Sequence, residues 1–351
     1  MLVPGRMSAE GKSANRCGVP SFLVVGPPRT GTSWLHEVLS NRTLLPYPTK
    51  ETRFFDLHFH RGLEWYRAHY PNSNSADDLR MGEVGPTYFA SAKARERIAK
   101  TVPDAKIICV FRDPVARMLS LYRLKLAYGM IRWSFEEAVV RDPELMETSR
   151  YATHLKAWRK DFGSEQLLAT TYDDLEADPQ RYLNTLLDFI GIPRFDLSHS
   201  RSQCVHASEG MTLPRSYYRT KAATTVADWL KARRLDRVVA SVRNSALRKL
   251  FLGGGTAFVE PSPKFIATLY ELCRPEVEEL EVMLNLDFSA WKISEPTGPL
   301  ATTNKISQDS AACIQPNEVR ATTILESSHN LIPSIRSADA NLVQTQLKAK
   351  C

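Results

Sequence analysis

The sequence Ser21-Phe-Leu-Val-Val-Gly26-Pro-Pro-Arg-Thr-Gly-Thr-Ser-Trp34 passes from a short apolar run, through a turn rich in glycine and proline, into residues of helical character. The apolar residues that follow recur at helical spacing up to about Asn41. This succession is typical of a buried strand, a loop and a helix, in that order.

The same pattern recurs further along the chain. Ala105–Phe111 is a second apolar strand, and it leads through Arg112 into a helix predicted over residues 115–127. Gln166–Thr171 is a third candidate strand. Strands that alternate with helices predict an α/β fold: a central parallel sheet with helices on both faces. Ligands of such sheets bind beyond the carboxyl ends of the strands, so the loops after the first two strands should face one crevice.

Further helices are expected near residues 151–162, 179–190, 228–250 and 263–286. The last aromatic residue of the chain is Trp291, and a segment without rings rarely buries enough apolar area to offset its ordering entropy. We therefore expect three regions: a flexible N-terminus at 1–19, one domain at 20–291 and a disordered tail at 292–351.

The composition of the 351 residues is that of a globular protein, with 43% hydrophobic and 24% charged residues. The net charge of +7 favours an anionic ligand, whereas the basic stretch 215–249 is most simply a solvated surface, so nucleic acid is not expected as a partner. The six cysteines show neither paired nor zinc-ligand spacing, which predicts a reducing compartment and no metal. Without a signal peptide or an apolar run long enough to span a membrane, the expected location is cytoplasmic.

The first loop, Gly26–Ser33, has the spacing of a Walker A phosphate loop, but Thr32 stands where an ATP-using enzyme carries lysine. That lysine reaches the terminal phosphates of a nucleoside triphosphate, so its absence argues against a kinase. Backbone N–H groups at the start of the helix remain suited to one phosphate, with Arg29 supplying a positive charge. A purely structural turn before a helix is the alternative interpretation.

The second element follows the second strand. Arg112 leaves the strand at the crevice, and Ser120 lies two helical turns further on; both side chains can donate hydrogen bonds to phosphate. Asp113 and Pro114 have a structural explanation as the N-cap and the first turn of the helix. A structural role for Arg112 and Ser120 also remains open at this point.

Together the two elements resemble the PAPS-dependent sulfotransferase superfamily, in which PAPS is 3′-phosphoadenosine 5′-phosphosulfate. Pro28–Trp34 matches the form P-[RK]-[ST]-G-[TS]-[ST]-W, and Arg112–Tyr122 matches R-[DN]-P-x-x-R-x-x-S-x-Y. Three further runs are similar to the glycan-directed branch, which includes heparan sulfate sulfotransferases: Lys50–Asp56, Gly82–Tyr88 and Tyr151–Trp158. The resemblance covers about residues 20–291 and implies a P-loop-like nucleotide-binding fold.

The resemblance also implies roles for individual residues. Arg29 would act at the leaving phosphate, Lys50 near the sulfuryl group, and Glu51 as the base for the acceptor. Arg112 and Ser120 would bind the 3′-phosphate. The 5′-phosphate would be held by the loop, through the main chain of Thr30, Gly31, Thr32, Ser33 and Trp34. PAPS would be the co-substrate, and the reaction would need no metal.

The base has competing candidates. Glu51 could instead be a surface residue paired with Lys50 or Arg53. His58 and His60 are the next candidates, although their alternation with apolar residues also fits one face of a strand. Hydrogen-bonded structural roles are expected for two other histidines, His154 and His206.

The sequence also departs from the branch. Val84 and Gly85 replace a lysine and a serine of its G-E-K-S-P segment, which puts the acceptor class in doubt. A basic residue of a late loop often closes over the nucleotide in the family, and Arg215 is a candidate for it. The predicted acceptor is a carbohydrate or a small molecule, attacked through a hydroxyl or an amine. The rival hypotheses are a P-loop kinase and an inactive sulfotransferase-like protein that binds anionic polymers; the oligomeric state is not predicted.

Overall fold

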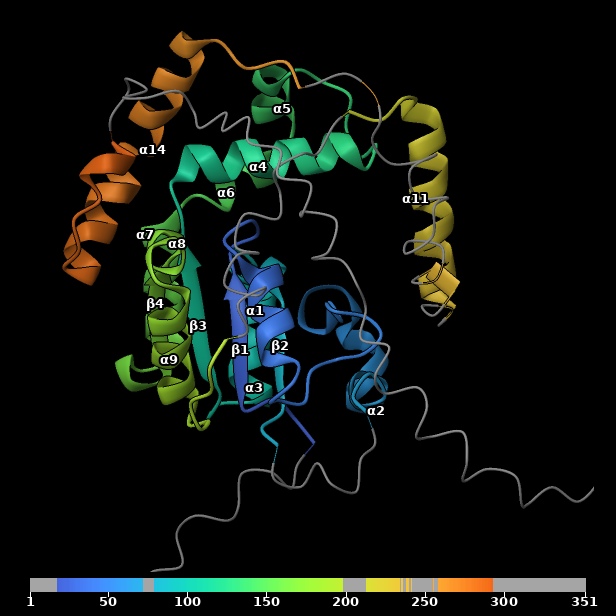
Figure 1. Cartoon of the computed structure of the whole chain (residues 1–351), viewed down its shortest axis with the longest axis vertical. Helices are drawn as coiled ribbons and strands as arrows, with labels where there is room; N and C mark the ends of the chain where they lie inside the picture. Colours follow the sequence, from blue (N-terminus) through green and yellow to red (C-terminus); the bar gives the residue numbers. More distant parts are fainter. Residues whose placement is uncertain are drawn as a thin grey trace, which may run out of the picture. The chain divides into compact units, whose positions relative to one another are not determined.

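A computed structural model of the chain describes residues 18–71, 79–197, 213–233 and 258–292, with a few isolated positions between the last two ranges. Its described strands form one parallel four-stranded sheet in the order β2-β1-β3-β4 (Figure 1). The strands are β1 (Phe22–Gly26), β2 (Gly82–Val84), β3 (Lys106–Phe111) and β4 (Leu167–Thr171). Strand β2 lies on one side of β1, and β3, which comes next in the chain, lies on the other side. The strand order therefore reverses between β1 and β3, and parallel sheets bind their ligands at such a point.

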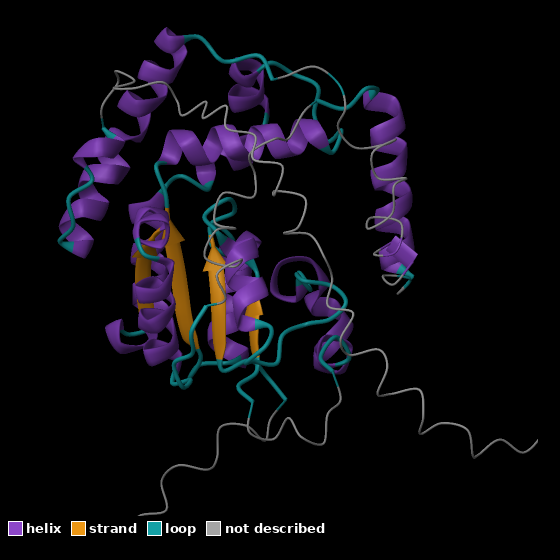
Figure 2. Ribbon diagram, in the orientation of Figure 1, coloured by secondary structure: helices purple, strands orange, loops and turns teal. Residues whose placement is uncertain are grey.

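Successive side chains of the central strands enter two different cores, because side chains alternate across a sheet. On β1, Leu23 and Val25 pack into one apolar cluster, whereas Phe22 and Val24 pack into the other. Helices cover both faces of the sheet (Figure 2). The predicted α/β fold with a doubly covered parallel sheet is therefore confirmed for the described residues.

Three groups of helices surround the sheet. The helices α1 (Thr32–Leu39), α8 (Tyr172–Ala177) and α9 (Pro179–Ile190) line one face. The other face is lined by α2 (Gly62–Arg67), α3 (Ala92–Thr101), α7 (Tyr151–Asp161) and part of α14 (Pro263–Leu284). A third apolar cluster joins the rest of α14 to α4 (Pro114–Ala127), α5 (Phe135–Arg141) and α6 (Pro143–Glu147). In Figure 1, α4 crosses above the carboxyl ends of the strands.

The sequence placed most of the elements that flank the crevice within one or two residues, but several expectations were wrong. The strand interpretation of Leu57–His60 fails, because a π-helix spans Phe54–His58 and a 3-10 turn spans Phe59–Arg61. The helix expected at 228–250 begins earlier, since α11 spans Tyr217–Ala232. Strand β2 was not recognised as a strand, because three residues are too few for a periodic signal.

Several predictions fall outside the described residues: most of the N-terminus 1–19, nearly all of the tail 292–351, most of the segment 234–250, and His206. The domain limits at residues 20 and 291 therefore stay predictions. Among the described helices, none is both long enough and apolar enough to cross a lipid bilayer.

Candidate functional site

The loop between β1 and α1 has the backbone shape of an anion-binding loop. Arg29 and Gly31 both have positive φ, at 73° and 83°. The Thr30 hydroxyl donates to the Pro27 carbonyl over 2.8 Å and so closes the turn from inside. Gly31 is the N-cap of α1, and it has no side chain that could accept hydrogen bonds from the first N–H groups of the helix. The start of α1 is therefore shaped to receive an external acceptor such as a phosphate oxygen.

Gly31 is required for packing as well as for its backbone angle. A Cβ at this position would lie 2.7 Å from the Leu175 side chain and 3.2 Å from the Tyr172 ring. Because α8 presses on the loop at this point, the phosphate loop is fixed by the segment that follows β4. This contact holds the loop against the sheet edge.

The two predicted phosphate-binding elements meet in space. Arg29 Nε donates to Ser120 Oγ over 2.9 Å, which links the loop after β1 to the second turn of α4. The Arg112 guanidinium lies 3.4 Å from the Arg29 carbonyl. Arg29, Arg112 and Ser120 therefore lie at one place, as expected for two elements that follow neighbouring strands.

The turn that carries Arg112 is held from three sides. The Tyr151 hydroxyl of α7 donates to the Arg112 carbonyl over 2.9 Å. Asp113 caps α4 by accepting from the Ala116 N–H, and Pro114 stands at its first turn, as predicted. The other Asp113 oxygen accepts from the Tyr270 hydroxyl of α14 at 2.9 Å. Arg112 thus projects from a rigid support.

Tyr172 is a site residue that the sequence analysis missed. The Arg112 guanidinium lies 4.3 Å from the centre of the Tyr172 ring, and the same ring lies against Gly31. Tyr172 thus contacts both phosphate elements. The available signal was its position directly after the third predicted strand, at the same sheet edge as the other two loops.

The electrostatics of Arg29 and Arg112 favour an anion between them. Burial, and next the charge of Arg112, lower the pKa of Arg29. Among the described residues, the hydrogen bonds and ring contacts of the two guanidinium groups go to a hydroxyl, a carbonyl and an aromatic ring rather than to a carboxylate. Two neighbouring guanidinium groups that hydrogen-bond to no carboxylate in the described part of the chain are stabilised by a bound anion, so the residues present fit a nucleotide that carries several phosphates.

Lys50 and Glu51 lie beside the start of α1. Lys50 Nζ donates to Ser33 Oγ over 3.1 Å and lies 3.4 Å from Glu51 Oε1. Both side chains are about three-tenths exposed, which leaves the carboxylate accessible. Of the two alternative partners of Glu51, Lys50 is observed, whereas Arg53 pairs with Asp56.

The remaining members of the loop have mixed roles. The side chains of Thr30, Thr32 and Trp34 are buried, whereas Ser33 is exposed. His154 Nε2 donates to the Glu147 carbonyl over 3.0 Å, in keeping with a structural histidine. Arg215 is exposed, and its role at the nucleotide stays a prediction.

The two departures from the glycan-directed branch have structural explanations. Val84 is fully buried in the cluster that contains α1, where a lysine would have to leave the core. At Gly85, a Cβ would lie 2.3 Å from the Tyr88 ring, so a serine cannot be added without moving that ring. The space beside β2 is thus filled by this chain's own side chains.

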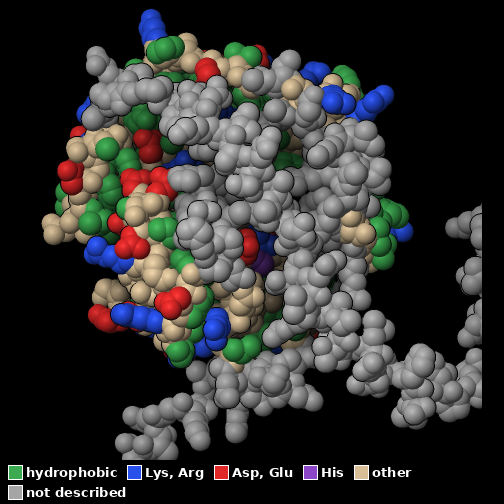
Figure 3. All heavy atoms as spheres, viewed as in Figure 1, with side chains coloured by type: hydrophobic (Ala, Val, Ile, Leu, Met, Phe, Trp, Pro, Cys, Tyr) green, Lys and Arg blue, Asp and Glu red, His purple; other side chains and the backbone are tan. Residues whose placement is uncertain are grey.

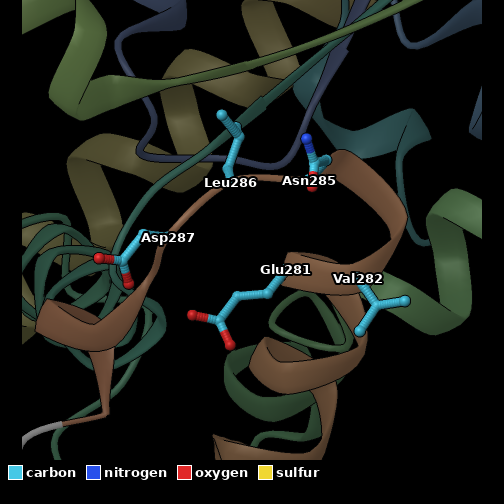
Figure 4. Close-up of a pocket in the computed structure, with 5 residues that line it drawn as sticks. All are labelled: Glu281, Val282, Asn285, Leu286 and Asp287. Carbon is cyan, nitrogen blue, oxygen red and sulfur yellow. The ribbon is translucent and has the colours of Figure 1, made fainter.

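A separate open depression lies at the C-terminal end of α14 (Figure 4). Its lining residues are Glu281, Val282, Asn285, Leu286 and Asp287. Glu281 pairs there with Lys292 at 2.7 Å. None of the predicted site residues contributes to this depression, and it is not the candidate site.

Comparison with known proteins agrees with this geometry. The family described as the sulfotransferase domain matches residues 20–234. A mouse bifunctional heparan sulfate N-deacetylase/N-sulfotransferase 4 is 30% identical over 207 residues, which are 52% of this chain and 23% of that protein. A mouse heparan sulfate glucosamine 3-O-sulfotransferase 3B1 is 30% identical over 234 residues, with 62% of this chain and 60% of that protein covered. The expected likeness to the glycan-directed branch is confirmed.

The matched region spans only about a quarter of the length of the bifunctional relatives. Among solved structures, a sulfotransferase from Alicyclobacillus acidocaldarius superposes with a TM-score of 0.56 at 19% identity, covering 78% of this chain and 99% of the other. That likeness supports the fold. With a family match over more than half of its length, and with both phosphate elements at one sheet edge, the chain belongs to the sulfotransferase domain family.

Proposed function

We propose that the protein transfers a sulfuryl group from PAPS to a hydroxyl or amine of an acceptor. The observation that carries the proposal is the meeting of Arg29, Arg112 and Ser120 at the carboxyl ends of two adjacent strands. The two loops can then hold the opposite phosphates of a single nucleotide. Had the two arginines entered different cavities, one nucleotide could not have bridged them.

The proposed nucleotide contacts follow from the positions of the donors. The main-chain N–H groups at the start of α1 would bind the 5′-phosphate. Arg112 and Ser120 would bind the 3′-phosphate, which ATP lacks. Arg29 links the first element to the second through its hydrogen bond to Ser120, and its charge is suited to the oxygen that bridges sulfur and phosphate.

The bound PAPS supplies an activated sulfur whose bond to the phosphate oxygen can break. In the proposed transfer, the acceptor oxygen or nitrogen forms a bond to sulfur on the side opposite the leaving phosphate, and the acceptor proton passes to Glu51. Lys50, held by Ser33, lies between the base and the phosphate loop. The charge that develops on the leaving group would be stabilised by Arg29.

The proposed acceptor is a carbohydrate, because the relatives reported above are named for heparan sulfate. The exposed Glu51 carboxylate is compatible with an extended acceptor that approaches from solvent. A small metabolite is the alternative acceptor, and it agrees at least as well with the predicted cytoplasmic location. The choice between a hydroxyl and an amine is left to the assay.

The two rival hypotheses are weaker on the same observations. A kinase would need a lysine where the buried Thr32 stands. A protein that only binds anionic polymers would need a broad basic surface. On the face shown in Figure 3, acidic side chains lie among the basic ones within the described part of the chain.

The test is an assay with radiolabelled PAPS and a panel of desulfated heparan sulfate, phenols, lipids and amines. We expect label on at least one acceptor, without added metal, and about 10²–10³-fold slower transfer with the Arg29→Met variant. Magnesium-dependent ATP turnover would support the kinase instead. Salt-sensitive binding of heparin or DNA without any transfer would support the binding protein.

A further inference from the structure

Glu83 is a carboxylate enclosed within the sheet edge at β2, with no exposed surface. Its Oε1 accepts from the Thr52 N–H at 3.1 Å, the Thr52 hydroxyl at 2.6 Å and the Tyr88 hydroxyl at 3.0 Å. Its Oε2 accepts from the Tyr66 hydroxyl at 2.8 Å. Burial raises the pKa of Glu83, and these donors oppose that effect. A buried carboxylate needs such hydrogen bonds to offset its desolvation, whereas an apolar residue in the same space would need none. The donors around Glu83 are therefore a specific feature of this position.

Two of these contacts, both from Thr52, bear on the segment that carries the proposed base. Thr52 directly follows Glu51, and residues 51–53 belong to no helix or strand. The Thr52 hydroxyl also accepts from the Phe54 N–H at 3.1 Å, where the π-helix begins. The main chain on both sides of Thr52 is therefore held by side-chain hydrogen bonds that converge on Glu83.

The same segment reaches the phosphate loop from its other side. Lys50 is bound to Ser33 of α1, while Thr52 is bound to Glu83 of β2. Glu51 lies between these two attachments. Its distance from the loop is thus determined by one exposed contact and one buried contact, of which the buried contact is the more rigid.

We infer that Glu83 is a positioning residue for sulfuryl transfer: through Thr52 it fixes the main chain that carries Lys50 and Glu51 against the phosphate loop. The inference rests on the proposed function, in which Glu51 is the base. Glu83 itself is buried and does not contact the reactants. Its effect should therefore appear in turnover and not in nucleotide affinity.

The neighbouring hydroxyls allow a conservative replacement. The Tyr66 and Tyr70 hydroxyls lie 2.7 Å apart, and the Tyr70 hydroxyl donates to the Gly82 carbonyl at 3.2 Å. In the Glu83→Gln variant the side-chain amide can donate to Tyr66, Tyr66 to Tyr70, and Tyr70 to Gly82. The carbonyl oxygen can still accept from Thr52, so this variant should retain the position of the segment.

The decisive comparison uses substitutions of nearly equal size. Thr52→Val removes the hydroxyl from the Glu83 contact, Thr52→Ser keeps it, and Thr170→Val is the matched control. Thr170 is a buried threonine of β4, and its hydroxyl lies 2.9 Å from that of Tyr182 in the core on the other sheet face. Each variant is measured for kcat with the best acceptor of the panel. The Kd for 3′-phosphoadenosine 5′-phosphate and amide hydrogen exchange over residues 51–54 complete the set.

We expect Thr52→Val to lower kcat by about 10- to 100-fold, since displacement of a catalytic group by about 1 Å has effects of this size. Its nucleotide Kd should stay within about twofold, and its exchange at residues 51–54 should accelerate. Thr52→Ser and Glu83→Gln should retain most of the wild-type kcat. Thr170→Val should lower stability only.

Several outcomes would overturn the inference. One is an unchanged kcat and unchanged exchange in Thr52→Val. Another is an equal loss of kcat in Thr170→Val, which would indicate general destabilisation. If the wild type transfers no sulfuryl group, the proposed function fails, while the exchange data still decide whether Glu83 holds the segment.

Discussion

Arg29 donates from Nε to the hydroxyl of Ser120 over 2.9 Å, although 91 positions separate the two residues in the chain. The contact joins the loop at the start of α1 to the side of α4. Each element was predicted to bind a different phosphate, so the hydrogen bond shows that their donors share one site.

Arg112→Ala should weaken binding of 3′-phosphoadenosine 5′-phosphate by about 10- to 100-fold, as one charge-assisted hydrogen bond contributes about 1.5–3 kcal/mol. Binding of adenosine 5′-phosphate, which lacks the 3′-phosphate, should hardly change. Calorimetry with both nucleotides measures the difference. Arg123→Ala is the control, since Arg123 lies on α4, the helix that follows Arg112, and pairs with Glu260. An equal loss for both nucleotides would remove Arg112 from the 3′-phosphate.

Glu51→Gln should lower kcat by about 10²–10⁴-fold, the usual contribution of a general base, and should leave nucleotide affinity unchanged. The amide retains the size of the side chain but cannot accept the acceptor proton. Steady-state kinetics and calorimetry on the same preparation check both parts. Wild-type turnover in this variant would transfer the role of base to His58 or His60.

Arg29→Lys should retain more activity than Arg29→Met, because lysine keeps the positive charge near the leaving phosphate. For Arg29→Met we expect a loss of about 10²–10³-fold in kcat, as for the removal of one preorganised donor. The comparison of the two variants separates charge from shape. Equal activity of both would mean that the charge of Arg29 does not act in the transfer step.

The stability of the protein should decrease as the pH falls from about 6.5 to about 4. Burial, and next the charge of Lys50, lower the pKa of His36 to about 4, and its buried Nε2 has no hydrogen-bond partner. Between these pH values the unfolded chain binds more protons than the folded one. The contribution of His36 to the stability is therefore complete above the pKa of this residue in the unfolded chain. It is lost as the pH falls toward the pKa of His36 in the folded protein.

The change in the free energy of unfolding that is due to His36 should amount to about 3 kcal/mol at most. Urea unfolding at pH 4.5 and 7.5 measures it. His36→Gln should reduce the difference in the free energy of unfolding between the two pH values. His60→Gln, at an exposed position, should leave this difference as in the wild type. If His36→Gln retains the full pH dependence, other groups cause it.

The crevice was largely predictable from sequence because its donors follow strands that are almost entirely apolar. Phe22–Gly26 and Lys106–Phe111 are buried on both faces, so their apolar runs are unambiguous and fix where Arg29 and Arg112 emerge. The role of Asp113 as the N-cap of α4 was equally predictable, since it depends on residues within one helical turn.

The residues that escaped prediction act through contacts distant in sequence. Glu83 belongs to a strand of three residues, and its partner Thr52 lies 31 positions earlier in irregular chain. Tyr172 depends on the packing of α8 against the phosphate loop. The contact of Glu83 leaves no periodic or local signal, and Tyr172 had only its position directly after the third predicted strand, so the folded arrangement was needed to identify both contacts.

The hydroxyl of Tyr270 on Asp113 has a practical consequence for production of the protein. A shortened chain that ended at residue 234, where the family match stops, would lack α14 altogether. It would lose the bond that steadies the Arg112 turn and would leave bare the apolar surfaces that Leu269 and Val277 now cover. Such a truncation should aggregate and bind nucleotide poorly, although every residue of the two phosphate motifs would still be present.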